Sequence, residues 1–483
     1  MHKILTVLFA ASLPVFAASD YRIEDIPLPE GSPPEVGGID FAPDGSMFVV
    51  LRRGDVFKTT PKPNSTAFDW KLFATGFHNG CGIDALSPTK VRVTQMSEMT
   101  EAEDTDGDGT ADRYRRFAAG WGLSGNYHET NTLAEDGKGG YYIAIGTASY
   151  NGPVFKHTLG DYSKTGRRGR NFSGVKWRGW VMHSDAEGNL TPCASGFRMH
   201  NGIHVDAQGD IWSSDNQGDW KATTPLYHVE KGNFYGHPSS LVWDPKWAGK
   251  DPLAFYHDDL NAYNRDRTHA AVEIPYQEMN RSGSEPMVIP NNFPYFPGQM
   301  ILLDNNGTRI TRIMLEKIDG AFQGACTHFI NGDGLRSGNN RVRFTPDGKS
   351  LYVGQTVRGW GKLAEGMQRI TPVSDTAPFD IDRVSICPQG FYLSFTHPSA
   401  DEATDVQVQS FTYQSNWNYG GPMIDKKKHT ATATWSDNKL HLKIDELQAG
   451  RIYQINLPEL KSKDNSPLRN RVVYYTANRL PKE

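Results

Sequence analysis

One short pattern recurs along most of this chain. In each copy a short apolar strand is followed by an Asp-Gly type of turn and then by a second strand, as in GIDFAPDGSMFVV from Gly38. Further copies begin at Gly82, Thr132, Gly202, Phe296 and Arg341. Such a strand pair buries both of its faces only when other small sheets pack against it. A loose repeat of these units is therefore typical of a β-propeller.

The copies predict an all-β chain whose residues 18–375 form a six-bladed β-propeller, with two stacked β-sandwiches as the alternative. The pattern stops near the linker TPVSDTAPFD, which begins at Thr371. After it, stretches such as VQVQSF and TATATW alternate with a period of two. Residues 376–483 are therefore predicted to form a small β-sandwich of the immunoglobulin or fibronectin type.

The amino terminus reads MHKILTVLFAASLPVFA, in which one Lys precedes a short apolar stretch and small residues follow. This arrangement predicts a signal peptide over residues 1–17, cleaved after Ala17, with an uncleaved anchor as the alternative. No later segment is apolar enough to cross a bilayer. We expect a periplasmic or secreted protein.

Composition excludes some partners and sites. The net charge of −4 argues against a nucleic-acid partner, because phosphate contacts require a basic surface. Export permits disulfides, and the pairing of the four cysteines is left open, with buried structural roles as the alternative. No CxxC or CxxCH motif occurs, so neither a zinc ribbon nor an attached haem is expected. The cysteines are Cys81, Cys193, Cys326 and Cys387.

Polar side chains gather just before the first strand of several units. In a propeller these strand entries meet around the central channel, so the pattern predicts a ligand site there. The alternative is that Asn and His side chains only satisfy backbone groups at strand ends. The residues are His78, Asn79, Asn126, His128, Arg198, His200, Asn201, Arg336, Asn339 and Asn340.

Two stretches resemble the pyrroloquinoline-quinone (PQQ) sugar dehydrogenases, the soluble glucose and sorbosone dehydrogenase family. They are HETNTLAEDGKGGYYIAIGTASYNG from His128 and GFRMHNGIHVDAQGDIWSSDNQGDW from Gly196, which is followed by a closing GNFYGHP. The resemblance covers residues 117–238 well and the other units only by pattern. It implies a six-bladed propeller that oxidises a carbohydrate hydroxyl with PQQ and Ca²⁺, and a redox partner protein that accepts the electrons.

The same resemblance implies roles for individual residues. His128 falls where the family has its general base, a role that suits a neutral imidazole. Arg198 falls where an Arg stabilises negative charge on the quinone. Asp215 and Asp219 lie in the loop where the family holds Ca²⁺, which carboxylate and amide oxygens suit. The candidate cofactor contacts are Asn201, His200, Asp215, Asn216, Gln217, Arg336 and Asn340.

Some positions depart from the family pattern. The family has a Lys where this chain reads Asn305-Asn306-Gly307, and a pair of Arg where it has Gly338 and Asn340. A tricarboxylate cofactor needs cationic partners, and these are not matched. Two alternatives therefore stay open. One is a lyase or hydrolase of acidic glycans, with His128 as base and with Arg198 and Ca²⁺ neutralising a substrate carboxylate. The other is a non-catalytic glycan-binding propeller.

A second cation signal is the run EDTDGDGTAD. Asp104, Asp106 and Asp108 stand at alternate positions before a Gly, as in the front of an EF-hand loop. Arg115 stands where the bidentate Glu is expected, and Asp112 offers a late ligand. The spacing predicts a structural Ca²⁺ site, with a solvated acidic turn as the alternative.

The insert from Asn151 to Trp180 is basic and Gly-rich, and from Lys164 it reads KTGRRGRNFSGVKWRGW. Its cations would suit an acidic substrate such as a uronate or a sulfated sugar, and they are Lys164, Arg167, Arg168 and Arg170. A solvated loop is the equally weighted alternative.

Overall fold

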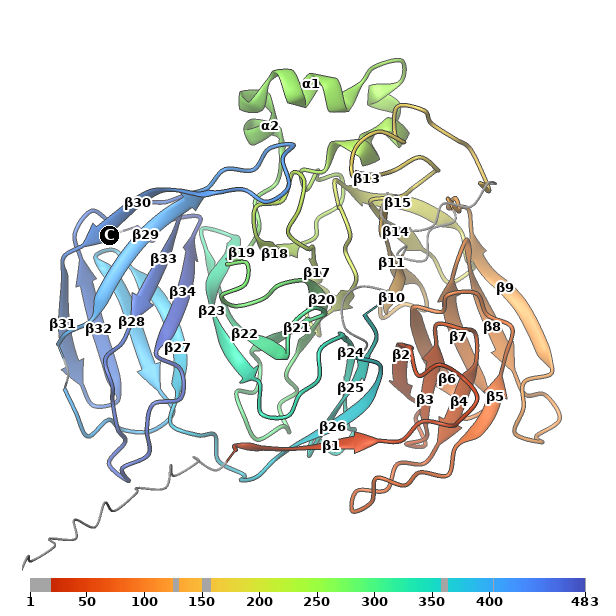
Figure 1. Ribbon diagram of the computed structural model, residues 1–483, viewed down its shortest axis with the longest axis horizontal. Coiled ribbons are helices and arrows are strands. Elements are labelled where there is room, and N and C mark those ends of the chain that lie inside the picture. Colours follow the sequence, from red (N-terminus) through yellow and green to blue (C-terminus); the bar gives the residue numbers. More distant parts are fainter. Residues whose placement is uncertain (1–18, 125–129, 150–157, 358–363, 403, 483) are drawn as a thin grey trace, which may run out of the picture.

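The computed structural model describes residues 19–124, 130–149, 158–357, 364–402 and 404–482. Small antiparallel sheets dominate it, as the sequence predicts, and Figure 1 shows them side by side around a common centre. No helix in the described part of the chain is long and apolar enough to span a membrane. The helices lie together over residues 238–266, and they are η1 (Pro238–Trp243), η2 (Pro245–Trp247), α1 (Pro252–Asp258) and α2 (Leu260–Asp266).

The sheets of the ring follow one another along the chain. The first two consist of β2 (Val36–Phe41), β3 (Met47–Leu51), β4 (Val56–Thr59) and β5 (Lys71–Ala74), then β6 (Gly82–Ser87), β7 (Lys90–Gln95), β8 (Glu98–Glu103) and β9 (Arg113–Ala119). The next two consist of β10 (Asn131–Glu135), β11 (Tyr141–Ile145), β14 (Trp180–Ser184) and β15 (Leu190–Ser195), then β16 (Ile203–Val205), β17 (Ile211–Ser214), β18 (Thr224–His228) and β19 (Val272–Ile274). A separate pair is β12 (Ala148–Ser149) with β13 (Asn171–Phe172).

The remaining ring sheets are closed by the two ends of the repeat region. One consists of β20 (Gly283–Val288), β21 (Met300–Asp304), β22 (Arg309–Ile318) and β23 (Ala321–Asn331). The other joins β24 (Asn339–Phe344), β25 (Leu351–Gln355) and β26 (Gly366–Pro372) to the first strand of the chain, β1 (Tyr21–Ile26). The first strand of each sheet contacts that of the next, and β24 contacts β2, so the ring is closed. This is the arrangement of a β-propeller.

The turns explain why the repeat folds in this way. In β2–β3 the Asp44 carboxylate accepts a hydrogen bond from Ser46 N at 3.0 Å, and Gly45 adopts a φ of +84°. Asp136 and Gly137 play the same parts between β10 and β11. An Asp that bonds the backbone two residues on, followed by a residue free to take positive φ, reverses the chain tightly.

One repeat unit lies at a different place in its sheet from the one its sequence suggests. The strands of the copy from Phe296 are β21 and β22, the second and third strands of their sheet. The first strand, β20, carries no Asp-Gly turn and was missed. β20 pairs with β21 across a connection that contains Pro and no Asp-Gly turn. The turn signal that identifies the other units is therefore absent here.

The C-terminal strands form two sheets that share one apolar core. One sheet consists of β27 (Ile381–Cys387), β28 (Gly390–Phe395), β31 (Ala431–Ser436) and β32 (Lys439–Ile444). The other consists of β29 (Gln407–Tyr413), β30 (Met423–His429), β33 (Arg451–Asn456) and β34 (Val472–Ala477). Leu393 and Leu442 of the first sheet pack with Tyr453 and Tyr475 of the second. β34 also pairs with β23, which joins this region to the ring.

All four cysteines are buried and unpaired in the structure. Cys193, Cys326 and Cys387 lie in β15, β23 and β27, which belong to three different sheets, and Cys81 lies just before β6.

Candidate functional site

The hairpin β16–β17 brings two polar segments together at one end of its sheet. Residues 196–201 lead into β16, and residues 215–221 follow β17. Asp215, which is fully buried, joins them by accepting hydrogen bonds from Arg198 N at 2.7 Å and Met199 N at 2.8 Å. A carboxylate that satisfies backbone donors in this way fixes the shape of both segments.

Arg198 is held at this junction by side chains of the second segment. Its Nε donates to Asp219 Oδ1 at 2.6 Å, and its Nη1 donates to Asn216 Oδ1 at 2.8 Å. Only 4% of Arg198 is exposed. Its guanidinium carbon lies 5.4 Å from the ring centroid of Tyr419, which belongs to the C-terminal region.

Asp219 is the counter-charge of this group. Its Oδ2 lies 3.4 Å from Nε2 of His237, whose Nδ1 in turn meets Ser239 Oγ at 2.8 Å. Burial would raise the pKa of Asp219, but Arg198 and His237 together hold it well below its usual range. The carboxylate is therefore ionised at neutral pH, and it holds the guanidinium in place.

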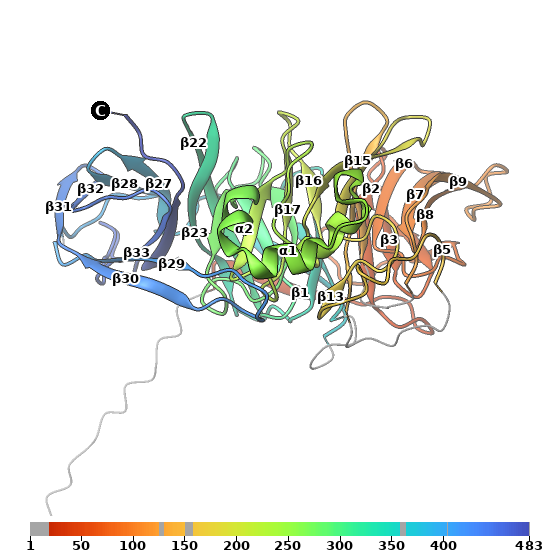
Figure 2. The ribbon, with the colours of Figure 1, turned by 90° about the horizontal axis from the view of Figure 1, so that it is seen from above.

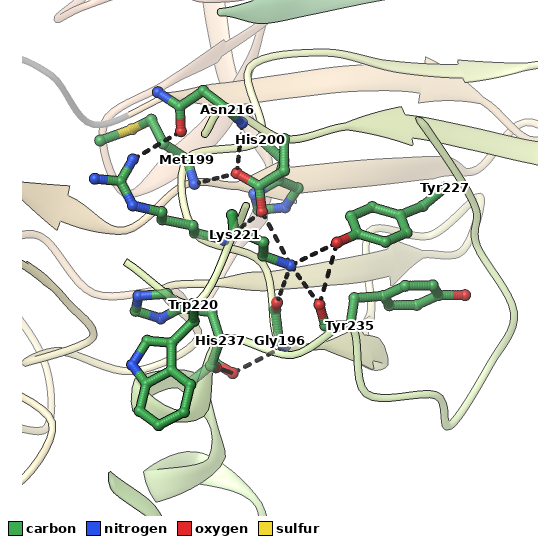
Figure 3. Close-up of polar contacts among 12 residues, drawn as sticks. Gly196, Met199, His200, Asn216, Trp220, Lys221, Tyr227, Tyr235 and His237 are labelled. Atoms are coloured by element: carbon green, nitrogen blue, oxygen red, sulfur yellow. Dashed lines mark hydrogen bonds and ion pairs between the residues drawn. The ribbon is translucent and has the colours of Figure 1, made fainter. Parts of the chain in front are cut away.

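Lys221 forms the second buried cation of the site (Figure 3). Its ammonium donates to Tyr227 Oη at 2.8 Å and Gly196 O at 3.1 Å, contacts Tyr235 O, and lies 3.5 Å from Asp215. Burial lowers the pKa of Lys221 to about 8, although Asp215 opposes the shift. All of these partners belong to the protein, so Lys221 stabilises the segment of residues 215–221 through contacts with buried groups.

The loop between Asp215 and Lys221 needs its Gly and its strained backbone. A Cβ on Gly218 would lie 2.2 Å from the guanidinium carbon of Arg198, so only Gly lets Arg198 lie flat on the loop. Trp220 adopts a φ of +65° and donates its N–H to Asn416 O at 2.7 Å. Tyr263 of α2 donates to Trp220 O at 2.8 Å. Contacts from two other elements thus hold a conformation that Trp rarely adopts.

Several other predicted residues lie deeper, where the strand entries meet. Arg341 donates to the carbonyls of Cys81, Asn201 and Asn340, and so ties three sheets together at the centre. The Asn201 amide donates to Asn340 Oδ1 at 2.8 Å. The Asn340 amide donates to Val36 O at 2.9 Å, so Asn340 satisfies a backbone group at a strand entry, whereas Asn201 bonds a side chain.

His200 is fully buried and stacks on Phe197 at 4.4 Å between ring centroids. Its Nε2 lies 3.1 Å from Trp180 O, and its Nδ1 has no partner among the described residues. Burial lowers its pKa to about 4, so the ring is neutral at pH 7. His200 is a core residue rather than a group open to solvent.

Arg336 and Gln217, two further predicted cofactor contacts, lie in different surroundings. Arg336 pairs with Asp25 at 3.2 Å and donates to the carbonyls of Glu365 and Met367, so it stabilises the sheet closed by β1. Gln217 is 9% exposed, and its Oε1 has no partner within the described residues. His128, the predicted base, lies outside the described residues.

The carboxylates of Asp215 and Asp219, predicted as calcium ligands, have their partners within the chain and do not fit a calcium ion in this arrangement. The two oxygens of Asp215 accept three backbone N–H bonds and face Lys221. Those of Asp219 bind Arg198 and His237. Both carboxylates are therefore neutralised by cations of the chain. Sequence reasoning missed the signal, because Lys221 and His237 flank the stretches in which the acids were noticed.

The acidic loop between β8 and β9 is organised differently. The carboxylates of Asp104, Asp106 and Asp108 each offer an oxygen within 4.8 Å of the others. Asp104 accepts from Gly107 N at 2.7 Å and Gly109 N at 2.9 Å, which wraps the loop around it. Asp112 instead accepts from Thr105 Oγ1, at 2.8 and 2.7 Å to its two oxygens. Within the described residues this is the group whose spacing suits a metal ion.

Comparisons with known proteins support the fold. A family model described as a domain of unknown function, DUF7133, matches residues 67–244, which is less than half of the chain. No curated protein matches. The PQQ domain of pyranose dehydrogenase from Coprinopsis cinerea is similar at 14% identity and a TM-score of 0.51, over 73% of this chain and 96% of that one. The PQQ-bound aldose sugar dehydrogenase from Streptomyces coelicolor matches at 14% identity and a TM-score of 0.48, over 73% and 98% of the two chains.

Proposed function

We propose that the protein is a sugar-dehydrogenase-like enzyme that acts on a carbohydrate hydroxyl beside Arg198. The scaffold would be a six-bladed propeller over residues 18–375 with a β-sandwich over residues 376–483. The observation that carries the proposal is the fixed guanidinium of Arg198, held by Asp219 and Asn216 beneath the half-exposed ring of Tyr419. A preorganised cation of this kind stabilises negative charge that develops on a substrate oxygen.

The buried cations at this face do not fit PQQ. Arg178 donates to the carbonyls of Gly122 and Gly146 and to Asn131, while Arg341 and Lys221 are bound to carbonyls in the same way. A tricarboxylate needs several donors turned toward it. We therefore assign this face the binding of the sugar and the stabilisation of charge, and we assign none of its described residues to the quinone. His128 remains the proposed general base.

The test uses the full-length protein, titrated with PQQ and Ca²⁺ while dye reduction is followed with a panel of aldoses and uronates. We expect substrate-dependent reduction that falls about 100-fold in Arg198→Met, which is the size of effect seen when one charge-stabilising donor is removed. His128→Ala should abolish turnover without lowering the melting temperature. Arg471→Gln, which removes an exposed partner of Glu459, is the matched control. No reduction with any substrate would overturn the proposal.

A second candidate is a lyase or hydrolase of acidic glycans. It is favoured by the exposed Arg170, whose guanidinium lies 4.3 Å from the Tyr419 ring centroid, and by the poor fit of the buried cations to a quinone. Incubation with anionic polysaccharides would release unsaturated or hydrolysed oligosaccharides. This outcome together with absent dye reduction would replace the first proposal.

We also propose that the acidic loop binds a structural Ca²⁺ through Asp104, Asp106 and Asp108. The convergent oxygens and the backbone bonds that wrap the loop support this assignment. Ca²⁺ here would fix the β8–β9 connection and take no part in the reaction.

Export and electron transfer complete the proposal. Residues 1–17 lie outside the described residues and are proposed to be a cleaved signal peptide, which would deliver the protein to the periplasm or the medium. Amino-terminal sequencing of the expressed full-length chain should begin at Ala18. In a dehydrogenase, a redox partner protein would accept the electrons.

A further inference from the structure

A loop of the C-terminal region reaches the site that the propeller builds. It comprises residues 414–422, between β29 and β30, and is called here the β29–β30 loop. Figures 1 and 2 both show it leaving the C-terminal sheets and ending beside α1 and α2. Asn416 O accepts from Trp220 N at 2.7 Å, and Gly420 N donates to Gly218 O at 3.1 Å. The loop thus lies on the segment that clasps Arg198.

The backbone of the β29–β30 loop is closely fitted to this segment. A Cβ on Gly420, which has a φ of +74°, would lie 2.2 Å from Nε2 of Gln217. A Cβ on Gly421 would lie 2.5 Å from that of Ala222. Gly420 is favoured by its positive φ, and Gly421 is needed because a Cβ there would also lie 2.0 Å from Gln414 O of the same loop. The loop is therefore shaped to lie against the side chains of Gln217 and Ala222.

The loop presents two aromatic rings at the edge of the site. Tyr419 is 49% exposed, and its ring centroid lies 5.4 Å from the guanidinium carbon of Arg198 and 4.3 Å from that of Arg170. Trp417 is 38% exposed and packs on His257 of α1 at 4.0 Å between centroids. Half-exposed rings fixed by cations and by a neighbouring ring provide flat apolar faces that lose little entropy on binding.

The charges around these rings favour an anionic occupant. On the Tyr419 side Arg170 is exposed, and Asp219 is paired with Arg198 and His237. On the Trp417 side the exposed Asp258 is paired with His257 at 3.3 Å. The surroundings of Tyr419 thus combine a half-exposed ring with an exposed cation.

We infer that Tyr419 and Trp417 of the C-terminal region form a subsite for an anionic sugar unit, whose ring stacks on them and whose carboxylate or sulfate binds Arg170. The inference rests on the proposed function in that it names the substrate class of the same face. It also assigns the C-terminal region a part in recognition, because the propeller alone supplies neither aromatic ring.

The test measures binding to the full-length protein by calorimetry with three probes: a galacturonate trisaccharide, a sulfated carrageenan oligosaccharide and neutral maltotriose. We expect the anionic probes to bind and maltotriose to bind at least tenfold more weakly. Tyr419→Ala should weaken anionic binding roughly fivefold, since a ring contact contributes about 1 kcal/mol. Tyr419→Phe should retain binding, and Arg170→Gln should abolish the preference for anions. The better of the two anionic probes identifies a uronate or a sulfated sugar.

Tyr392→Ala is the matched control, because Tyr392 is 47% exposed and stacks on His441 of β32, in the sheet that does not carry the loop. Thermal melts check that each variant is folded. Equal affinity of Tyr419→Ala and Tyr392→Ala, equal binding of maltotriose, or no binding of any probe would overturn the inference.

The same variants separate this inference from the proposed function. Weakened anionic binding in Tyr419→Ala without dye reduction by any substrate would retain the subsite and overturn the dehydrogenase. Substrate-dependent dye reduction with an unchanged KM in Tyr419→Ala and Trp417→Ala would retain the enzyme and overturn the subsite.

Discussion

Two Asp-rich segments of this protein, alike in sequence, have opposite electrostatic surroundings. In the segment after β17, Asp215 and Asp219 are buried against Lys221 and Arg198, cations supplied by the same chain. In the loop between β8 and β9, the oxygens of three Asp converge, and the partners they have there are backbone N–H groups. The difference shows that acidic spacing alone does not identify an ion site. What decides is whether a cation of the chain already occupies the space between the carboxylates.

The largest loss of stability is expected from breaking the buried ion pair between Asp219 and Arg198. Asp219→Ala leaves the guanidinium of Arg198 buried without its counter-charge. Loss of one partner of a buried pair costs about 3–5 kcal/mol, so the free energy of unfolding should fall by that amount in a denaturant titration. Asp69→Ala, which removes an exposed partner of Lys62, should leave the free energy of unfolding nearly unchanged, because solvent screens an exposed pair. Equal effects of the two variants would show that the buried pair is not needed.

The second prediction concerns the loop that lacks an internal cation. Ca²⁺ at 100 times its dissociation constant should stabilise the protein by about 2.7 kcal/mol, and a chelator should reverse this. The rise in melting temperature should be absent in Asp106→Asn and intact in Asp219→Asn, which keeps the shape of the other segment. A calcium response that survives Asp106→Asn would locate the ion elsewhere.

A third group of carboxylates sharpens the comparison, because a proton takes the place of the cation. Asp84 of β6 lies beside Glu135 of β10 and accepts a hydrogen bond from Tyr141. Burial, and then Glu135, raise the pKa of Asp84 to about 7. The folded protein therefore holds more protons than the unfolded chain between about pH 4 and pH 7, and its stability falls as the pH rises through that window.

Asp84→Asn mimics the protonated acid and removes this dependence. Its advantage in unfolding free energy over the wild type should grow from near zero at pH 4 to about 4 kcal/mol at pH 8. Denaturant titrations at the two pH values measure it, with Asp69→Asn as an exposed control. A constant difference across this range would show that Asp84 titrates normally.

Features set by neighbouring residues could be predicted from the sequence, and contacts between distant segments could not. The Asp-Gly turns report local backbone geometry, so the strand pairs they join were predictable, whereas β20, which has no such turn, was not. The residues around Arg198 were found because they precede or follow one hairpin. Their partners were not, since Tyr419 is about 200 positions away in another region of the chain and His237 lies beyond the next strand. Contacts between distant segments leave no periodic signal.

The smallest predicted effect distinguishes a ligand from a support within the acidic loop itself. Asp112 was predicted as a late calcium ligand, yet both of its oxygens face Thr105 Oγ1, outside the converging group of three Asp. If it only supports the loop, Asp112→Asn, which still accepts from Thr105, should weaken Ca²⁺ binding about twofold in a calorimetric titration. Asp106→Asn should weaken it more than tenfold, because a charged ligand is lost. Equal losses in the two variants would make Asp112 a ligand, drawn in when the ion binds.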